Sequence, residues 1–251
     1  MKPFVLLHGF TGSPRSWRCV VSLLPKEAVV FLPALLGHDG PGSGSAGPGG
    51  FAAEVERLAL LIRSAGIERA HLAGYSLGGR LALGLLLAHP ALFSSATLIG
   101  AHPGLESPAE RAERGRSDAR WARLLQDDGI ETFVDTWERQ PLFASQQALP
   151  GDLFAEQRRE RLTHDPRGLA RALEQLGLSQ MPAYRSRLGR IQVPVEVVTG
   201  ALDVRFTDLA AGMRKQLGDA RASVVPGAGH NVVLERPAMV ADALRRGVEA
   251  E

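Results

Sequence analysis

The 251-residue chain has one cysteine, three lysines and no long hydrophobic run. The lone cysteine, Cys19, excludes an internal disulfide framework and is typical of a reducing compartment. No apolar stretch approaches the ~20 residues that a membrane-spanning helix needs. The apolar stretch near the N-terminus, residues 4–8, is too short for a signal peptide. These absences predict a cytoplasmic protein that does not associate with membranes.

A strong net charge is also missing, because 29 lysines and arginines stand against 27 aspartates and glutamates. The net charge of +2 gives no reason to expect a nucleic-acid partner. With only three lysines, arginine is nearly the only strong cation. Codon bias in a GC-rich genome explains most of this preference. A few arginines are still candidates for binding an anionic ligand, because a guanidinium holds a carboxylate through two parallel hydrogen bonds.

Short apolar runs alternate with stretches of helical spacing over most of the chain. The runs expected to be strands are residues 4–7, 28–32, 70–73, 95–99, 193–199 and 222–225. Strands that alternate with helices predict an α/β fold with a mostly parallel sheet and helices on both faces. A segment rich in glycine and proline, residues 33–50, is expected to be an exposed, mobile loop.

The alternation stops between residues 102 and 190. Helical spacing continues there without a strand, through residues 111–125, 130–138, 154–162 and 168–177. A helical block that begins and ends at the functional edge of a sheet is typical of a lid. The length of the chain favours one domain with an insertion. We therefore expect a core made of residues 1–101 and 191–251, with residues 102–190 as a helical lid inserted between two strands.

The residues around Ser76 have the pattern G-x-S-x-G, from Gly74 to Gly78. An expected strand precedes this pattern, and an expected helix, residues 77–89, follows it. The two glycines leave room for a sharp turn that exposes the serine hydroxyl at the N-terminus of the helix. Free backbone N–H groups at that end stabilise negative charge. This nucleophile-elbow pattern makes Ser76 the candidate catalytic residue.

A catalytic serine needs a base and a carboxylate that orients the base. Asp203 follows an expected strand in a turn, and His230 follows the next expected strand in a glycine-containing loop. Either residue alone could be an ordinary turn or loop residue. The order Ser76, Asp203, His230, however, is that of the α/β-hydrolase fold. The backbone N–H groups of Phe10 and Leu77 are the expected oxyanion hole.

Several segments resemble the 2-succinyl-6-hydroxy-2,4-cyclohexadiene-1-carboxylate synthases, lyases of menaquinone biosynthesis in the α/β-hydrolase superfamily. The most specific similarities lie in residues 100–118, which begin Gly-Ala-His-Pro-Gly-Leu, and in residues 137–145. Residues 74–80 and 228–237 are also similar, although many hydrolases share those motifs. The resemblance extends over residues 8–237, nearly the whole chain.

The resemblance implies elimination of pyruvate from 2-succinyl-5-enolpyruvyl-6-hydroxy-3-cyclohexene-1-carboxylate, which gives 2-succinyl-6-hydroxy-2,4-cyclohexadiene-1-carboxylate. Ser76, activated by His230 and Asp203, would provide the base, and neither a metal nor an organic cofactor is needed. The substrate carries three carboxylates, so its pocket should hold several guanidinium groups. The residues expected to bind this small anionic substrate are Tyr75, Arg80, Arg114, Trp137, Arg158 and Arg205.

Other residues near these positions have different expected roles. Arg111 and Arg159 are the nearest alternatives if the helical register differs from the one assumed. Glu106 would repel an anionic substrate if its carboxylate faced the pocket. His8 is expected to brace the loop that carries Phe10 rather than to act as a base.

Two other functions fit parts of the same pattern. A carboxylic-ester hydrolase would use the same three residues, with Ser76 forming an acyl-enzyme. A non-catalytic receptor could bind a small ligand under the lid, but it would have no need of an intact serine, aspartate and histidine set. The sequence is compatible with a monomer or a homodimer.

Overall fold

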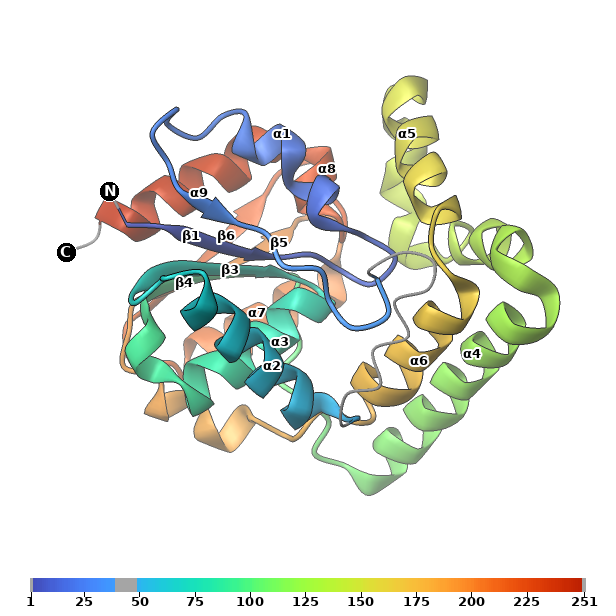
Figure 1. The fold of residues 1–251 in the computed structure, drawn as a ribbon, viewed down its shortest axis with the longest axis horizontal. Helices are drawn as coiled ribbons and strands as arrows, with labels where there is room; N and C mark the ends of the chain where they lie inside the picture. Colours follow the sequence, from blue (N-terminus) through green and yellow to red (C-terminus); the bar gives the residue numbers. More distant parts are fainter. Residues whose placement is uncertain (1, 39–48, 250–251) are drawn as a thin grey trace.

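The computed structural model describes residues 2–38 and 49–249, and its central element is a six-stranded sheet (Figure 1). The strands lie in the order β2-β1-β3-β4-β5-β6, and all described pairings are parallel. Their bounds are Phe4–Leu7 (β1), Val30–Phe31 (β2), Ala70–Tyr75 (β3), Phe93–Ile99 (β4), Val195–Gly200 (β5) and Ala220–Val225 (β6). The predicted α/β class is confirmed. The predicted loop at 33–50 falls mostly on residues 39–48, outside the described residues.

Helices cover both faces of the sheet (Figure 1). One face carries α2 (Phe51–Ser64), α3 (Leu77–Ala88) and α7 (Val204–Arg214), and the other carries α1 (Arg18–Val21), α8 (Val232–Glu235) and α9 (Pro237–Glu249). Each layer has its own apolar core against the strands. Strands β1, β3, β4 and β5 are buried at every residue, which explains why most of their residues are apolar.

Most of the segment between β4 and β5 forms a separate group of helices beside the sheet (Figure 1). Its elements are α4 (Pro108–Trp137), η3 (Pro141–Ala148), α5 (Gly151–Leu162), α6 (Pro166–Leu176) and η4 (Arg185–Arg190). The helices expected at 111–125 and 130–138 are parts of α4, which breaks at Gly129, where φ is 80°. No helix in the described ranges is both long and apolar enough to cross a bilayer.

Two parts of this segment pack against different neighbours. Helices α4 and α6 enclose their own apolar cluster, which includes Leu125, Phe133 and Leu169. From Leu176 to Ile191, by contrast, apolar side chains join the main core under the sheet. We call residues 102–176 the cap, because this is the part that packs on itself.

A buried histidine lies inside the sheet. His71 of β3 contacts Ser95 Oγ through Nδ1, at 2.8 Å, and Thr97 Oγ1 through Nε2, at 3.0 Å. Burial penalises the charged imidazolium and lowers the pKa of His71 from 6.5 to about 3. The ring therefore stays neutral in the folded protein down to acid pH.

This burial predicts acid-sensitive stability. Above pH 6.5 the His71 ring is neutral in both states and has no effect. Between pH 6.5 and about 3 only the unfolded chain binds the proton, so the free energy of unfolding falls as the pH falls. At pH 5 the loss from this one group is about 2 kcal/mol. Urea titrations at pH 7.5 and pH 5 measure this effect. Between these two pH values, the free energy of unfolding should fall by about 2 kcal/mol less in H71N than in the wild type. An equal loss in both proteins would contradict the assignment.

Candidate active site

Ser76 occupies the sharp turn between β3 and α3. Its φ of 52° and ψ of −104° lie in a region that residues with side chains rarely adopt. A side chain at Gly74 would lie against the backbone of Gly78, and one at Gly78 would lie against the carbonyl oxygens of Leu7 and His8. Crowding by backbone atoms therefore explains both glycines of the motif.

This crowding predicts the effect of a minimal change. Gly78→Ala pushes a methyl group into carbonyl oxygens of β1 and the loop after it, which cannot move aside as a flexible side chain could. We expect a loss of about 1–3 kcal/mol in the free energy of unfolding. The matched control is Gly151→Ala at the start of α5, where an added Cβ meets nothing within 4 Å. In thermal denaturation, the melting temperature should fall clearly for Gly78→Ala and hardly at all for Gly151→Ala.

The loops after β5 and β6 bring Asp203 and His230 to Ser76. His230 Nε2 lies 3.0 Å from Ser76 Oγ, and its Nδ1 lies 2.7 Å from Asp203 Oδ2. The loops approach closely at Gly200, where a Cβ would lie against the backbone of Gly229. The carboxylate accepts a hydrogen bond from the Nδ1–H group, which leaves Nε2 free to accept a hydrogen bond from the serine hydroxyl.

Aromatic rings and burial hold this histidine in place. The His230 ring lies between Tyr75, with centroids 5.5 Å apart, and Phe206, with centroids 4.4 Å apart. Phe206 also donates its backbone N–H to Asp203 Oδ1, at 3.4 Å. The His230 and Asp203 side chains are 2 % and 8 % exposed, so their mutual interaction is little screened by water.

The loop after β1 carries Phe10, and Leu77 begins α3. The N–H groups of a helix's first turn have no partner within the helix. In the same loop, His8 Nδ1 donates to the carbonyl of Gly9, at 2.8 Å, and its Nε2 accepts from the N–H of Leu35, at 3.2 Å. Burial lowers the pKa of His8 to about 4. His8 thus braces the loop as a neutral ring, as the sequence suggested.

A cavity of about 310 Å³ opens over these residues. Ser76, His230, Phe10 and Leu77 line it, together with the predicted Tyr75 and Trp137. Its described lining residues also include five arginines and a single carboxylate, that of Glu160; the arginines are Arg18, Arg80, Arg114, Arg161 and Arg205. Such a lining favours an anionic ligand.

Two of these arginines are close enough to repel each other. Arg80 donates from Nη1 to the carbonyl of Leu176, at 2.7 Å, and Arg114 donates from Nε to Asp118 Oδ1, at 2.8 Å. Burial, followed by the positive charge of Arg114, lowers the pKa of Arg80 from 12.5 to about 9, with Asp118 acting in the opposite direction. A bound anion would relieve this repulsion.

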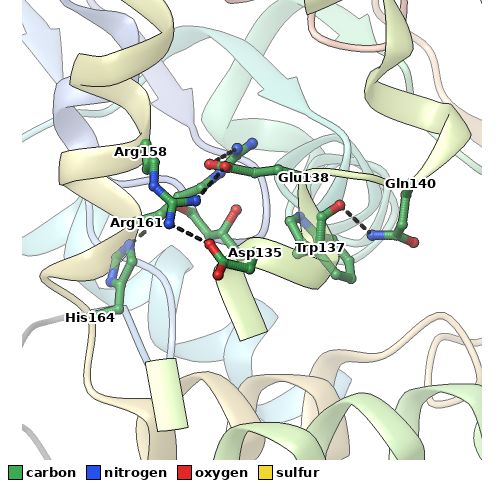
Figure 2. A network of polar contacts seen from close by, with 8 residues as sticks. Asp135, Trp137, Glu138, Gln140, Arg158, Arg161 and His164 are labelled. Atoms are coloured by element: carbon green, nitrogen blue, oxygen red, sulfur yellow. Dashed lines mark hydrogen bonds and ion pairs between the residues drawn. The ribbon is translucent and has the colours of Figure 1, made fainter. Parts of the chain in front are cut away.

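The structure places Arg158 differently from the sequence-based prediction. Arg158 is not among the cavity-lining residues. Its guanidinium pairs with Asp135 and with Glu138, at 2.8 Å for Glu138 Oε2 (Figure 2). Arg161, one helical turn later, lines the cavity instead and donates to Glu138 Oε1, at 2.9 Å. The side chain of Arg161 is 4 % exposed, against 34 % for Arg158.

The other predicted positions also have definite places. Arg205 lines the cavity. Glu106 lines a neighbouring hollow instead and pairs with Arg185 at 3.2 Å, so its carboxylate does not face the serine. Arg111 binds backbone carbonyls, including those of Ser179 and Met181, and Arg159 is not among the cavity-lining residues.

Sequence reasoning missed several residues of the cavity. His102, Phe206, Arg18 and Arg161 all line it. Burial, followed by the charges of nearby arginines, lowers the pKa of His102 to about 4. His102 lies in the segment that resembles the lyase family, which was a usable signal, but nothing in the local pattern marks Arg18. Among residues 2–38 and 49–249, no group of three or more histidine, cysteine, aspartate or glutamate side chains could hold a metal ion.

Comparison with known proteins agrees with this geometry. Residues 4–243 match the model of the alpha/beta hydrolase family. A protein of Bacillus subtilis (strain 168), named as a candidate 2-succinyl-6-hydroxy-2,4-cyclohexadiene-1-carboxylate synthase, is 36% identical over 93% of this chain and 85% of its own length. The synthase of that name from Enterobacter sp. (strain 638) is 34% identical over 96% of this chain and 89% of its own length.

Solved structures give the same result. The structure of MenH from S. aureus superimposes with a TM-score of 0.94 and 28% identity, covering 99% of this chain and 94% of its own. A thermophilic esterase from Thermogutta terrifontis, at 22% identity, has a TM-score of 0.86 and shares the fold. The chain therefore belongs to the α/β-hydrolase family and, within it, to the 2-succinyl-6-hydroxy-2,4-cyclohexadiene-1-carboxylate synthases.

Proposed function

We propose that this protein is a carbon–oxygen lyase of menaquinone biosynthesis. Its substrate is 2-succinyl-5-enolpyruvyl-6-hydroxy-3-cyclohexene-1-carboxylate, and its products are pyruvate and 2-succinyl-6-hydroxy-2,4-cyclohexadiene-1-carboxylate. The relatives that carry this enzyme's name match nearly the whole chain. We further propose that the enzyme acts in the cytoplasm, as a monomer or a homodimer, without a metal or an organic cofactor.

The observation that carries this proposal is the pair of arginines, Arg80 and Arg114, that line the cavity beside Ser76. Arg80 and Arg114 repel each other in the cavity, and Arg161 and Arg205 add further positive charge. Asp118 offsets part of this repulsion. A neutral ester would leave the rest in place, whereas a substrate with three carboxylates would relieve it. The cavity therefore favours the anionic lyase substrate over the simple esters that a carboxylic-ester hydrolase cleaves.

The proposed chemistry uses Ser76 as a base. His230 Nε2 takes the hydroxyl proton of Ser76, and Asp203 stabilises the imidazolium that forms. The serine oxygen removes a proton from the substrate ring, and the electrons of that C–H bond move toward the succinyl carbonyl. The N–H groups of Phe10 and Leu77 hold the resulting oxyanion. Collapse of this intermediate breaks the ring C–O bond, and enolpyruvate leaves and takes up a proton to become pyruvate.

The helical segment would act as a lid. Residues 102–190 supply Arg114, Trp137 and Arg161 to the cavity, so some of the cavity's binding groups lie on a different segment from Ser76. Enclosure would keep water from the reacting carbons and strengthen the interaction between carboxylates and guanidinium groups. We propose that the core of residues 1–101 and 191–251 and this lid are functionally distinct parts.

A direct assay tests the function. The purified protein is mixed with the enolpyruvyl substrate, and pyruvate is measured through coupled NADH oxidation. Hydrolysis of p-nitrophenyl acetate is measured in parallel. Rapid pyruvate release with slow ester hydrolysis supports the lyase. Rapid ester hydrolysis without pyruvate release would instead assign an ester hydrolase that works through a Ser76 acyl-enzyme, and binding without either reaction would assign a receptor.

The contrast between Arg158 and Arg161 gives a prediction with an internal control. Both lie on α5 and both pair with Glu138, but only Arg161 lines the cavity. We expect Arg161→Met to lower kcat/KM for pyruvate release at least tenfold, which corresponds to about 1.4 kcal/mol. Arg158→Met should change it less than threefold. Steady-state kinetics of both variants check this, and the reverse order would place Arg158 in the site.

A further inference from the structure

Thr11 stands next to Phe10 in an unusual conformation. Its φ of 63° is left-handed, and within residues 2–38 and 49–249 Ser76 is the one other non-glycine residue with a positive φ. Thr11 is buried, at 4 % exposure. A residue with a branched side chain adopts this region only when its surroundings enforce it. Contacts around Thr11 must therefore hold its backbone in this conformation.

Two histidines form hydrogen bonds with the backbone of Thr11. The N–H of Thr11 donates to His38 Nε2, at 3.2 Å, and the carbonyl of Thr11 accepts from His164 Nε2, at 3.2 Å. His38 Nδ1 lies 3.0 Å from the carbonyl of Leu36, to which it donates. The two rings also meet edge to face, with centroids 5.4 Å apart. Neither imidazole takes part in the proton transfers proposed above.

The hydrogen bond from His164 continues through two peptide groups to Phe10. The Thr11 carbonyl belongs to the peptide whose N–H is that of Gly12, and that N–H donates to the carbonyl of Gly9, at 3.1 Å. The Gly9 carbonyl in turn belongs to the peptide whose N–H is that of Phe10. Because a trans peptide is planar, its carbonyl and its N–H point in opposite directions along one line. Fixing each carbonyl therefore fixes the direction of the N–H on the same peptide.

His164 reaches this loop from the cap. It lies between α5 and α6, shortly after Arg158 and Arg161 (Figure 2). The cap also touches Phe10 directly, because the Phe10 ring packs edge to face on Trp137 of α4, with centroids 5.2 Å apart. The loop with the proposed oxyanion donor therefore depends on the cap as well as on the sheet.

We propose that His164 is a positioning residue: it orients the N–H of Phe10 through the Thr11–Gly12 and Gly9–Phe10 peptides. The Gly9 carbonyl also accepts from His8 Nδ1, so His164 supplies a second restraint on the oxyanion hole, present when the cap segment that carries His164 is seated on the loop. This couples cap closure to catalysis without any contact between His164 and the substrate. The inference rests on the proposed use of the Phe10 N–H as an oxyanion donor.

The test compares two amides at position 164. In H164Q the side-chain amide reaches the position of Nε2 and can donate to Thr11, whereas in H164N it stops near the position of Nδ1. We expect H164N to lower kcat for pyruvate release about 10- to 100-fold, somewhat less than the loss of an oxyanion donor itself. KM should stay within threefold, and H164Q should recover most of kcat. The matched control is Thr163→Ala, which should behave like the wild type. The hydroxyl that it removes donates to the carbonyl of Glu160.

A second measurement does not depend on the substrate. Phosphonylation of Ser76 by a small uncharged fluorophosphonate places its P=O oxygen in the same hole but needs none of the arginines. H164N should slow this reaction by a similar factor, and H164Q should restore it. If the wild type is phosphonylated but releases no pyruvate, the lyase proposal fails while this inference is still tested.

Three results would overturn the proposal. The first is a folded H164N with unchanged kcat and phosphonylation rate, and the second is a rise in KM alone. The third is an H164Q variant as slow as H164N, which would mean that the ring acts through packing. If H164N does not fold, H164L, which fills the same space without a donor, takes its place in both measurements with the same expected losses.

Discussion

Replacing Ser76 by alanine should lower kcat for pyruvate release by about 10⁴-fold or more, because the proposed proton acceptor is lost while the cavity is kept. The hydroxyl lies 3.0 Å from His230 Nε2, and no other side chain is proposed to take the ring proton. A loss of 10⁴ corresponds to about 5.4 kcal/mol of transition-state stabilisation. The measurement is pyruvate release in single-turnover and steady-state assays, with the variant at high concentration.

Controls separate loss of chemistry from loss of structure. Ser16→Ala removes a different hydroxyl that also lines the cavity, and it should keep activity within a few-fold. The alanine variant at position 76 should bind the tricarboxylate substrate with nearly the wild-type dissociation constant, as measured by calorimetry, because the arginines are untouched. Residual activity within tenfold of the wild type would show that Ser76 is not the base.

Replacing Arg80 by methionine should lower kcat/KM for pyruvate release at least 100-fold, about 2.7 kcal/mol. Arg80 follows Ser76 by one turn of α3, and its guanidinium is fixed by the carbonyl of Leu176. Losing it removes a bidentate partner for a substrate carboxylate in a partly buried position. Arg80→Lys should recover only part of the loss, because an ammonium group cannot make the paired hydrogen bonds.

The same variant should not lower stability. Arg80 lies beside Arg114, and partial burial together with the positive charge of Arg114 lowers its pKa to about 9. Removing one of two repelling charges should leave the melting temperature unchanged or raise it, so activity and stability should move in opposite directions. Arg116→Met, an exposed position two residues beyond Arg114, is the control and should affect neither. Full activity in the Arg80 variant would remove this residue from the site.

The parts of the fold that the sequence predicts are those set by near neighbours in the chain. Continuous apolar runs such as Phe4–Leu7 identify buried parallel strands, because such strands have no polar face. Gly74 and Gly78 mark the turn at Ser76 because backbone atoms crowd both positions. The helices expected at 111–125 and 130–138 are one element with a break at Gly129, since glycine alone does not show whether a helix ends or bends.

The same distinction applies to the candidate site, because chain order predicts some of its residues and not others. The order of Ser76, Asp203 and His230 predicts their meeting, because loops after neighbouring parallel strands share one edge of the sheet. The sequence does not show whether Arg158 or Arg161 faces the cavity. Residues three apart lie on adjacent faces of a helix, so a small rotation of α5 about its axis decides which one faces the cavity. That rotation is set by packing against α4 and by Glu138.

By itself, then, the sequence determined the α/β class, the serine turn and the family, because these depend on local spacing and on chain order. Only the tertiary structure decided which arginines face the serine, that Glu106 faces away from it, and that His164 reaches the loop of Phe10. Each of those facts depends on how the cap is rotated and seated against the sheet. Contacts between different elements set that orientation, such as Glu138 with Arg161 and Thr11 with His164, and no local pattern records them.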